Sequence, residues 1–188
     1  MCGIVGYVGE RDAVEVVMAG LHRLEYRGYD SAGLAVVEGG HLDYVKSLGK
    51  LAALEERLVA TPLHGRLAIG HTRWATHGAP SEVNSHPHLD GPREIAVVHN
   101  GIIENFPQLR AQLQAEGVTF RSQTDTELLA HLFRKYYRGN LFEAVKQALK
   151  EVEGAYAIAV VCQDEPEVLV AARHGSPLVL AALAVYGV

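Results

Sequence analysis

Cysteine is scarce in this sequence, which contains only Cys2 and Cys162 among its 188 residues. Two cysteines cannot provide the disulfide framework that holds small secreted domains together. No signal peptide precedes Cys2, although secretion would require one. The length is that of one ordinary domain. We therefore expect a single domain with free thiols in the cytoplasm.

Long apolar runs and runs of like charge are also missing. The longest apolar stretch, Leu178 to Val188, is too short to span a bilayer and is typical of a strand or of a severed chain end. Charged residues make up 21% of the chain and the formal net charge is -5, with neither sign concentrated in one segment. This pattern argues against nucleic acid and membrane partners and favours a small or neutral ligand.

The first nine residues place a thiol one peptide bond from the amino terminus. If Met1 is removed, Cys2 carries both a thiol and a free α-amine. An α-amine titrates near ~7.7–8.0 and a thiol near ~8.5, so the amine is suited to take the thiol proton at neutral pH. Cys2 is therefore a candidate for nucleophile and base in one residue. The alternative is a small apolar residue at the start of a buried strand.

Apolar runs and helix-start signals occur in groups rather than in strict alternation. Strands are predicted at 4–8, 32–37, 42–46, 67–74, 94–99, 155–161 and 168–172. Capping pairs predict helices that begin at Asp12, Asn105, Thr124 and Asn140, and another helix is predicted at 51–58. Grouped elements favour an α+β sandwich, with antiparallel sheets inside and helices on their outer faces. A barrel is the alternative.

Two arginines are candidates for contact with an anionic group. Arg73 and Trp74 lie at the root of a long irregular connection that reaches about Arg93. Such a loop is usually a binding loop or a lid, and a guanidinium suits a carboxylate; the alternative is a surface ion pair beside a core aromatic. Arg27 lies in a glycine-rich segment that is either a turn or a source of positive charge near the thiol.

Asn100-Gly101 follows the predicted strand at 94–99. This dipeptide is ordinarily a turn, but its amide NH₂ and unhindered backbone N–H could also stabilise an oxyanion. Asp125 falls in the first turn of a predicted helix, where the helix dipole keeps a carboxylate ionised. It is either a substrate ligand or a contributor to helix electrostatics alone.

Five histidines raise the question of a metal site. They occur without cysteine or paired carboxylates at the spacings of zinc sites, so we predict no metal and no cofactor. The five are His71, His77, His86, His88 and His99.

Several segments in fixed order resemble one enzyme family. They resemble the glutaminase domain of glutamine–fructose-6-phosphate aminotransferase, also called glucosamine-6-phosphate synthase, a class II amidotransferase with an N-terminal cysteine nucleophile. The resemblance runs from Cys2 to about Val179. It implies a four-layer αββα sandwich of the N-terminal-nucleophile (Ntn) type and hydrolysis of L-glutamine to glutamate and ammonia through a Cys2 thioester. The segments are 1–6, 27–33, 71–78, 99–105 and 124–127.

The resemblance also implies residue roles. Cys2 corresponds to the nucleophile, with its freed amine as the base. Asn100 and Gly101 correspond to the oxyanion hole. Arg73 corresponds to the ligand of the glutamine α-carboxylate, and Asp125 to the ligand of its α-ammonium group.

Further residues correspond to accessory parts of the family's site. Thr76 and His77 fall in a segment that resembles the loop covering glutamine. Trp74 matches the aromatic side chain that gates the passage of ammonia. Arg27 and His86 are candidates for supporting roles.

The resemblance also defines what we do not expect this chain to contain. It implies a glutaminase domain at 2–188 without the two sugar-isomerase domains, which bind fructose 6-phosphate and form homodimers in the full-length family members. Two features depart from the family pattern: Gln123 stands where Glu is common, and 180–188 is plainly apolar.

Two other interpretations remain open at this point. The chain could be the glutaminase domain of a phosphoribosyl-pyrophosphate amidotransferase or of an asparagine synthetase. It could also be a non-catalytic binding module, inactive because Met1 is retained.

Overall fold

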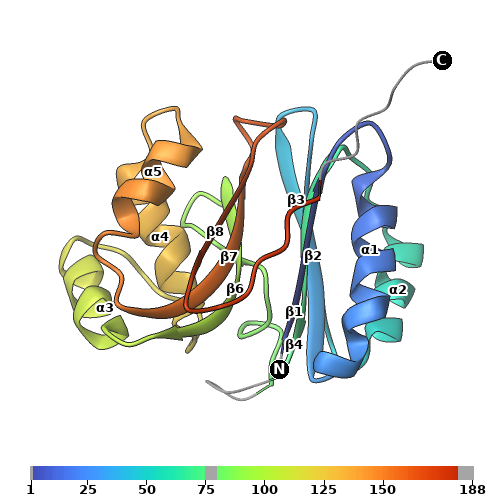
Figure 1. Cartoon of the computed structure of the whole chain (residues 1–188), viewed down its shortest axis with the longest axis horizontal. Helices are drawn as coiled ribbons and strands as arrows, with labels where there is room; N and C mark the ends of the chain where they lie inside the picture. Colours follow the sequence, from blue (N-terminus) through green and yellow to red (C-terminus); the bar gives the residue numbers. More distant parts are fainter. Residues whose placement is uncertain (1, 75–79, 182–188) are drawn as a thin grey trace.

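Two antiparallel sheets lie face to face in the middle of the molecule, and helices cover the outer face of each sheet (Figure 1). The structure is a computed structural model that describes residues 2–74 and 80–181. These residues form eight strands, five α-helices and one 3-10 helix, η1 (Glu25–Arg27). The arrangement is the four-layer αββα sandwich expected from the sequence.

The first sheet comes from the amino-terminal part of the chain and has the strand order β1-β4-β2-β3. Helices α1 (Ala13–Leu24) and α2 (Leu51–Ala60) pack on its outer face. The strands are β1 (Gly3–Val8), β2 (Ser31–Glu38), β3 (His41–Leu48) and β4 (Leu67–Arg73).

The second sheet has the strand order β5-β6-β7-β8. Its helices are α3 (Phe106–Ala115), α4 (Thr126–Tyr136) and α5 (Leu141–Ala148). The strands are β5 (His88–Leu89), β6 (Ile95–Ile103), β7 (Gly154–Cys162) and β8 (Leu169–His174).

The inner core lies between the two sheets and consists of small and branched apolar side chains from both. Because β2, β4 and the part of β6 up to His99 have one face against this core and the other against helices, their residues are buried almost without interruption. This explains why these strands are apolar runs rather than alternating patterns. The inner core consists of Ala35, Val37, Leu67, Ile69, Ala96, Val98, Ala159 and Val161.

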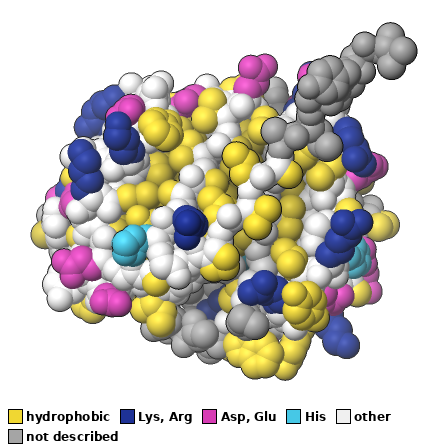
Figure 2. Space-filling view, in the orientation of Figure 1, with side chains coloured by type: hydrophobic (Ala, Val, Ile, Leu, Met, Phe, Trp, Pro, Cys, Tyr) yellow, Lys and Arg dark blue, Asp and Glu magenta, His cyan; other side chains and the backbone are white. Residues whose placement is uncertain are grey.

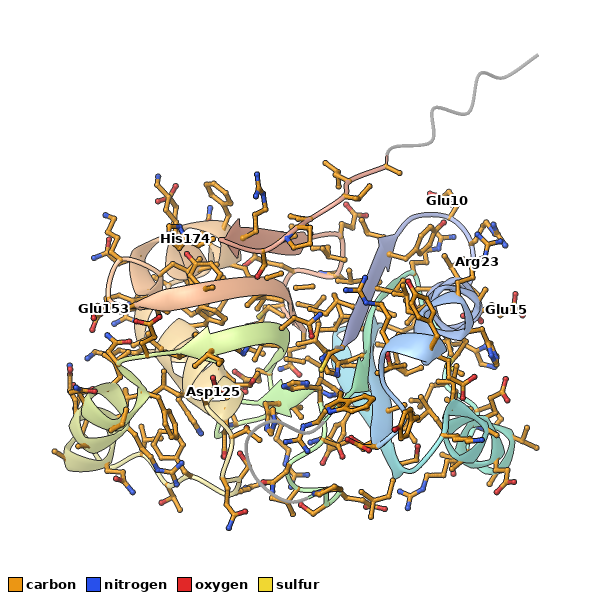
Figure 3. The ribbon with its side chains drawn as sticks, turned by 60° about the horizontal axis from the view of Figure 1, so that its bottom comes forward. Glu10, Glu15, Arg23, Asp125, Glu153 and His174 are labelled. Carbon is orange, nitrogen blue, oxygen red and sulfur yellow. The ribbon has the colours of Figure 1, made fainter. Side chains whose placement is uncertain are left out.

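Charged side chains gather over the helices at both sides of the molecule, whereas the middle of the face seen in Figure 2 is mostly apolar or uncharged. Glu15 and Arg23 lie on the outer side of α1, while Asp125 lies inside at the start of α4 (Figure 3). No helix within the two described ranges is long and apolar enough to cross a membrane. Except for the buried Glu127 of α4, the charged side chains of the α-helices are at least partly exposed, as an amphipathic pattern requires.

Several local predictions are confirmed. The Asp12 side chain caps α1 by accepting a hydrogen bond from the Val14 N–H, and Asn140 caps α5 in the same way through Glu143 N–H. The β2–β3 hairpin turns at Gly39 and Gly40, whose φ angles of 58° and 77° suit a tight hairpin turn.

The prediction that Asn100-Gly101 ends a strand was wrong. Strand β6 continues to Ile103, with Asn100 opposite Ala157 and Gly101 opposite Tyr156. A Cβ atom at Gly101 would lie 2.0 Å from the Ala155 carbonyl oxygen, and its φ is 142°. Glycine is therefore required here by close strand contact inside the sheet rather than by a turn.

Two predicted helix caps were also wrong, because tertiary contacts use the capping side chains. Asn105 precedes α3, but its side chain bonds to Glu151 and Glu153 instead of capping the helix. Helix α4 begins at Thr126 rather than after a Thr124 cap, and Thr124 bonds to His88.

The structure describes only part of the segment 178–188, which was predicted to be a strand or a severed chain end. Residues 178–181 form no strand, and the remainder lies outside the described residues.

Candidate active site

A pocket of about 610 Å³ opens at one end of the interface between the two sheets. Its wall comes from the start of β1, the end of β4, the middle of β6 and the start of α4. Every predicted site residue that the structure describes lines this pocket: Cys2, Arg27, Arg73, Trp74, His86, Asn100, Gly101 and Asp125. Thr76 and His77 lie outside the described residues.

The Cys2 thiol is fixed against the backbone where β1 begins and β4 ends. Its Sγ accepts a hydrogen bond from the Trp74 N–H at 3.1 Å and lies 3.5 Å from the Trp74 carbonyl oxygen. The register that pairs Gly3 with Thr72 brings the two strand ends together. A residue next to the amino terminus thereby meets the root of a segment more than 70 positions away in sequence.

Arg73 places a positive charge in the same pocket. Its side chain is 4% exposed, and burial lowers its pKa. Cys2, Asp30 and Asp125 oppose this shift through their negative charges. A guanidinium stays protonated even when its pKa falls, so the pocket contains a fixed cation close to three groups that can be negative.

Asn100 joins the two sheets at the site. Its amide Nδ2 donates to the Cys2 carbonyl oxygen at 3.2 Å, and its Oδ1 lies 2.8 Å from His71 Nε2. Burial lowers the pKa of His71 to about 3, so the ring is neutral at pH 7. Because Oδ1 can only accept, the His71 proton belongs on Nε2. The amide NH₂ group is thereby directed toward Cys2.

A buried chain of side chains supports this orientation. His71 Nδ1 lies 3.0 Å from His86 Nδ1, His86 Nε2 lies 2.9 Å from Thr126 Oγ1, and His99 Nδ1 lies 3.0 Å from the same oxygen. One assignment of protons satisfies all these contacts: each group donates to the next, from His99 through Thr126, His86 and His71 to Asn100. Burial lowers the pKa of His86 as well.

The sequence interpretation missed this chain. It considered these histidines as metal ligands, with His86 also a candidate for a supporting role, and His71 and His99 were not candidate site residues. The signal in the sequence is a histidine toward the end of each of two largely apolar predicted strands: His71 in 67–74 and His99 in 94–99. Within 2–74 and 80–181, no group of three or more His, Cys, Asp or Glu side chains is arranged to hold a metal ion.

Asp125 lies at the amino-terminal end of α4 and is 7% exposed. Its Oδ2 accepts a hydrogen bond from the Ile103 N–H at 3.0 Å, which ties α4 to the end of β6. Its Oδ1 lies 4.0 Å from His99 Nδ1. The carboxylate therefore helps to hold the sheet and also presents negative charge to the pocket, which it lines.

Aromatic and basic side chains form the rim. Trp74 is 44% exposed and packs edge to face on Tyr29, with ring centroids 5.1 Å apart. The segment around Arg27 is held against the end of β4, because the Asp30 N–H donates to the Arg73 carbonyl oxygen at 3.1 Å. The predicted turn and the predicted loop root are thus parts of one wall.

Comparison with known proteins agrees with this geometry. A sequence-family model described as "Glutamine amidotransferase domain" matches residues 71–183. Glutamine–fructose-6-phosphate aminotransferase [isomerizing] from Clostridium perfringens is 56% identical over 180 residues, and that from Thermus thermophilus is 58% identical. Each match covers 96% of this chain but only 30% of the relative, so the chain spans about a third of the length of these proteins.

Solved structures show the same fold. A glutamine phosphoribosylpyrophosphate amidotransferase from B. subtilis, complexed with ADP and GMP, superposes with a TM-score of 0.76 at 30% identity, covering 87% of this chain and 35% of that one. A glutamine aminotransferase class-II domain protein from Silicibacter pomeroyi gives 0.56 at 20% identity, covering 80% and 71%. The second likeness concerns the fold alone. The sandwich is that of the Ntn amidotransferases.

The neutral histidines predict a loss of stability in mild acid. A histidine whose pKa is lower in the folded than in the unfolded state stabilises the fold above its unfolded pKa, near ~6.5, and loses this contribution as pH falls toward the folded value. His71, with a folded pKa of about 3, should therefore cost about 2 kcal/mol of unfolding free energy between pH 7 and pH 5.

Urea unfolding at the two pH values measures this loss. His71→Asn should reduce the difference in unfolding free energy between pH 7 and pH 5 by about 2 kcal/mol, whatever the substitution does to the stability at pH 7. His41→Asn, at an exposed position on β3, is the matched control and should leave the difference unchanged. Equal stability of the unmodified chain at pH 7 and pH 5 would contradict the assignment of neutral buried rings.

Proposed function

The chain belongs to the glutamine amidotransferase family, and on this basis we propose that it hydrolyses L-glutamine to glutamate and ammonia through a thioester on Cys2. The observation that carries the proposal is the convergence of the Cys2 thiol, the Asn100 amide, Arg73 and Asp125 on one pocket. A nucleophile, an oxyanion donor and two opposite charges are the groups needed to attack the side-chain amide of a free amino acid.

In the proposed first step, removal of Met1 frees the Cys2 α-amine, which takes the thiol proton. The sulfur attacks the side-chain amide carbon of glutamine, and the carbonyl oxygen becomes an oxyanion. Asn100 Nδ2 and the Gly101 N–H donate to that oxyanion. The C–N bond then breaks, the Cys2 ammonium group returns its proton to the leaving nitrogen, and ammonia departs from the thioester.

Water completes the cycle. The Cys2 amine removes a proton from water as the oxygen attacks the thioester carbon, and the same two donors hold the second oxyanion. The C–S bond breaks, the thiolate regains the proton, and glutamate leaves. The amine thus acts as base, acid, base and acid in turn, and no other titratable group is needed.

Recognition of glutamine is assigned to the two charged side chains. Arg73 pairs with the α-carboxylate, for which its planar fork is suited. Asp125 pairs with the α-ammonium group. A peptide-linked glutamine lacks both charges, so this pair selects the free amino acid.

Two further residues have supporting roles in the proposal. His86 holds His71, which orients the Asn100 amide. Arg27 adds positive charge to the wall that contains Cys2. Neither is required to contact glutamine.

We also propose that residues 2–188 are the glutaminase domain of a longer aminotransferase. The identities of 56% and 58% to glutamine–fructose-6-phosphate aminotransferases support this assignment. The ammonia would then pass to sugar-isomerase domains that bind fructose 6-phosphate and form a homodimer, within the cytoplasm. Trp74, exposed at the pocket rim, would gate the exit, and Thr76 and His77 would cover bound glutamine.

A phosphoribosylpyrophosphate amidotransferase is the second candidate. The superposition on the B. subtilis enzyme favours it, but that enzyme is only 30% identical to this chain. The higher identity to the fructose-6-phosphate enzymes over 96% of the chain supports the first candidate.

Cys2→Ala should abolish glutamine hydrolysis, because no other thiol can form the thioester. Cys162 is the matched control, since it is fully buried in β7 and burial raises its pKa. Cys162→Ala should keep kcat within about twofold. Measured glutamate release and peptide mapping after alkylation with a glutamine-like diazoketone test both points. Labelling of Cys162 in place of Cys2, or activity in protein whose mass retains Met1, would refute the mechanism.

Asn100→Ala should lower kcat about 10²–10³-fold with a much smaller effect on KM, because an oxyanion donor acts mainly in the transition state. Asn105→Ala removes an amide of equal size whose partners are Glu151 and Glu153, away from the pocket. It should change stability but leave kcat nearly unaltered. Steady-state kinetics on both variants measures these effects on kcat and KM. An unchanged kcat in Asn100→Ala would show that Asn100 does not stabilise the oxyanion.

Arg73→Ala and Asp125→Asn should mainly raise KM, because each removes a charge that contacts glutamine equally in the ground and transition states. Asn at position 125 keeps an acceptor for the Ile103 N–H, so the loss reports charge. Glutamine esterified at its α-carboxylate provides the control: Arg73→Ala should add little to its already poor hydrolysis. If the unmodified chain hydrolyses the ester as well as free glutamine, Arg73 does not bind the carboxylate.

A further inference from the structure

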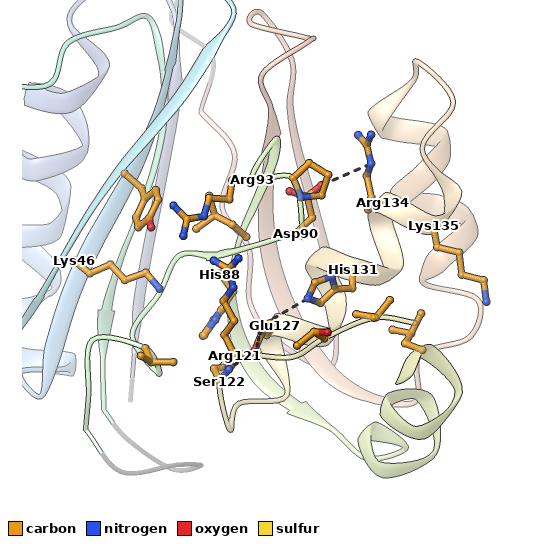
Figure 4. A pocket seen from close by; sticks show the side chains of 18 of the residues that line it. Lys46, His88, Asp90, Arg93, Arg121, Ser122, Glu127, His131, Arg134 and Lys135 are labelled. Carbon is orange, nitrogen blue, oxygen red and sulfur yellow. Dashed lines mark hydrogen bonds and ion pairs between the residues drawn. The ribbon is translucent and has the colours of Figure 1, made fainter. Parts of the chain in front are cut away.

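A second pocket, of about 1000 Å³, is separated from Cys2 by buried histidines: His86 and His99 line the Cys2 pocket, whereas His88 lines the second one. These three rings and His71 are called the histidine layer below. Side chains from β3, β5, the 90–93 turn, the segment before α4 and α4 itself surround the second pocket (Figure 4). It shares no lining residue with the Cys2 pocket. The two are therefore separate cavities, and nothing in the proposed reaction uses the larger one.

The carboxylates that line this larger pocket already have partners. Glu127 accepts hydrogen bonds from the Arg121 N–H, from the Ser122 N–H and from the Ser122 hydroxyl at 2.6 Å. The other acidic groups are in ion pairs: Glu82 with Arg57, Glu116 with Lys135, and Asp90 with Arg134. Three of the four lining carboxylates are thus paired with a cation in the pocket wall, whereas Glu127 is held by hydrogen bonds and keeps its negative charge.

Three lining cations have no such pairing. Among the described residues, no carboxylate oxygen lies within 4.0 Å of the charged nitrogens of Lys46, Arg93 or Arg121. The Lys46 ammonium donates only to the Ser85 carbonyl oxygen, at 2.8 Å. Burial is the main cause that lowers the pKa of Lys46 to about 8; Glu127 and Glu82 raise it by attraction, and Arg93 lowers it by a smaller repulsion. Two cations thus face the same space closely enough to repel each other (Figure 4).

A buried ion pair lies in the wall beside these cations. His131 is 8% exposed, and its Nε2 lies 3.6 Å from Glu127, within ion-pair distance but too far for a hydrogen bond (Figure 4). His131 lines the same pocket as the three cations, so its Nε2 could form a hydrogen bond with a ligand that enters.

We propose that this pocket is a binding site for a small organic phosphate. A phosphate monoester carries close to two negative charges and three acceptor oxygens, which matches an ammonium and two guanidinium groups better than a single carboxylate does. The volume is much larger than a bare phosphate needs. Apolar lining from Tyr44, Val83 and Val118 would contact the organic part.

Titration of the 188-residue chain with glucose 6-phosphate at low salt and pH 7, followed by amide chemical shifts, tests this site. Shifts should cluster at Lys46, Arg93 and Arg121, and glucose should bind at least about tenfold more weakly than glucose 6-phosphate because it lacks the charge. Inorganic phosphate should also bind more weakly, since it makes no apolar contacts. Equal affinities for the two phosphates would overturn the assignment to an organic phosphate.

Variants with matched charge locate the site. The double variant Lys46→Gln/Arg93→Gln should weaken binding about tenfold or more. Arg121→Gln should also weaken binding. Because Arg121 is exposed, this single variant tests the site even if the double variant folds poorly. Arg23→Gln/Lys150→Gln changes the net charge equally at exposed positions outside the pocket and should leave affinity unchanged.

Equal losses in the two double variants would mean nonspecific attraction, and no binding at about 10 mM would likewise refute the site. Cys2→Ala should bind normally, so failure of the glutaminase proposal and failure of this one give different results.

Discussion

The hydrogen bond between His71 on β4 and Asn100 on β6 is the polar contact on which the arrangement of the candidate active site depends. It joins one sheet to the other at the edge of the apolar inner core, and it fixes which end of the Asn100 amide faces Cys2. If the amide were reversed, its oxygen would face the Cys2 carbonyl oxygen, and only the Gly101 N–H would remain as a donor for an oxyanion. The packing of two sheets therefore determines the chemistry of one side chain.

Much of the fold could be predicted from local signals, because Asp12, Asn140 and the Gly39-Gly40 turn act through neighbours in sequence. The errors occurred where a distant partner uses the same side chain. Asn100-Gly101 has the composition of a turn, but pairing with β7 extends the strand through it. Thr124 has the spacing of a helix cap, yet its hydroxyl lies 2.9 Å from His88 Nε2. Neither partner can be identified from spacing alone.

The candidate site was predictable to a similar extent. Cys2, Arg73 and Asp125 carry reactive or charged groups, but each also had a purely structural interpretation. The family resemblance of the segments around them selected them, and the fold brings them to one pocket. The histidine chain depends instead on how β4, β6 and α4 pack, and histidines in a sequence suggest metal ligation as readily as hydrogen bonding. The cationic pocket draws on several separate elements and leaves no signature in any one of them.

The histidine layer also has an electrostatic consequence for both pockets. Burial is the main cause of the lowered pKa of His88. Lys46 on one side and Arg73 on the other lower it further, while Glu127 raises it. A proton added to this layer would thus lie between two cations. In the proton assignment above, both nitrogens of His71 and of His86 already have partners, so a second proton on His71 would face the Nδ1–H of His86. The layer remains neutral because both its hydrogen bonds and its positively charged neighbours oppose protonation, and that neutrality keeps the Asn100 amide directed toward Cys2.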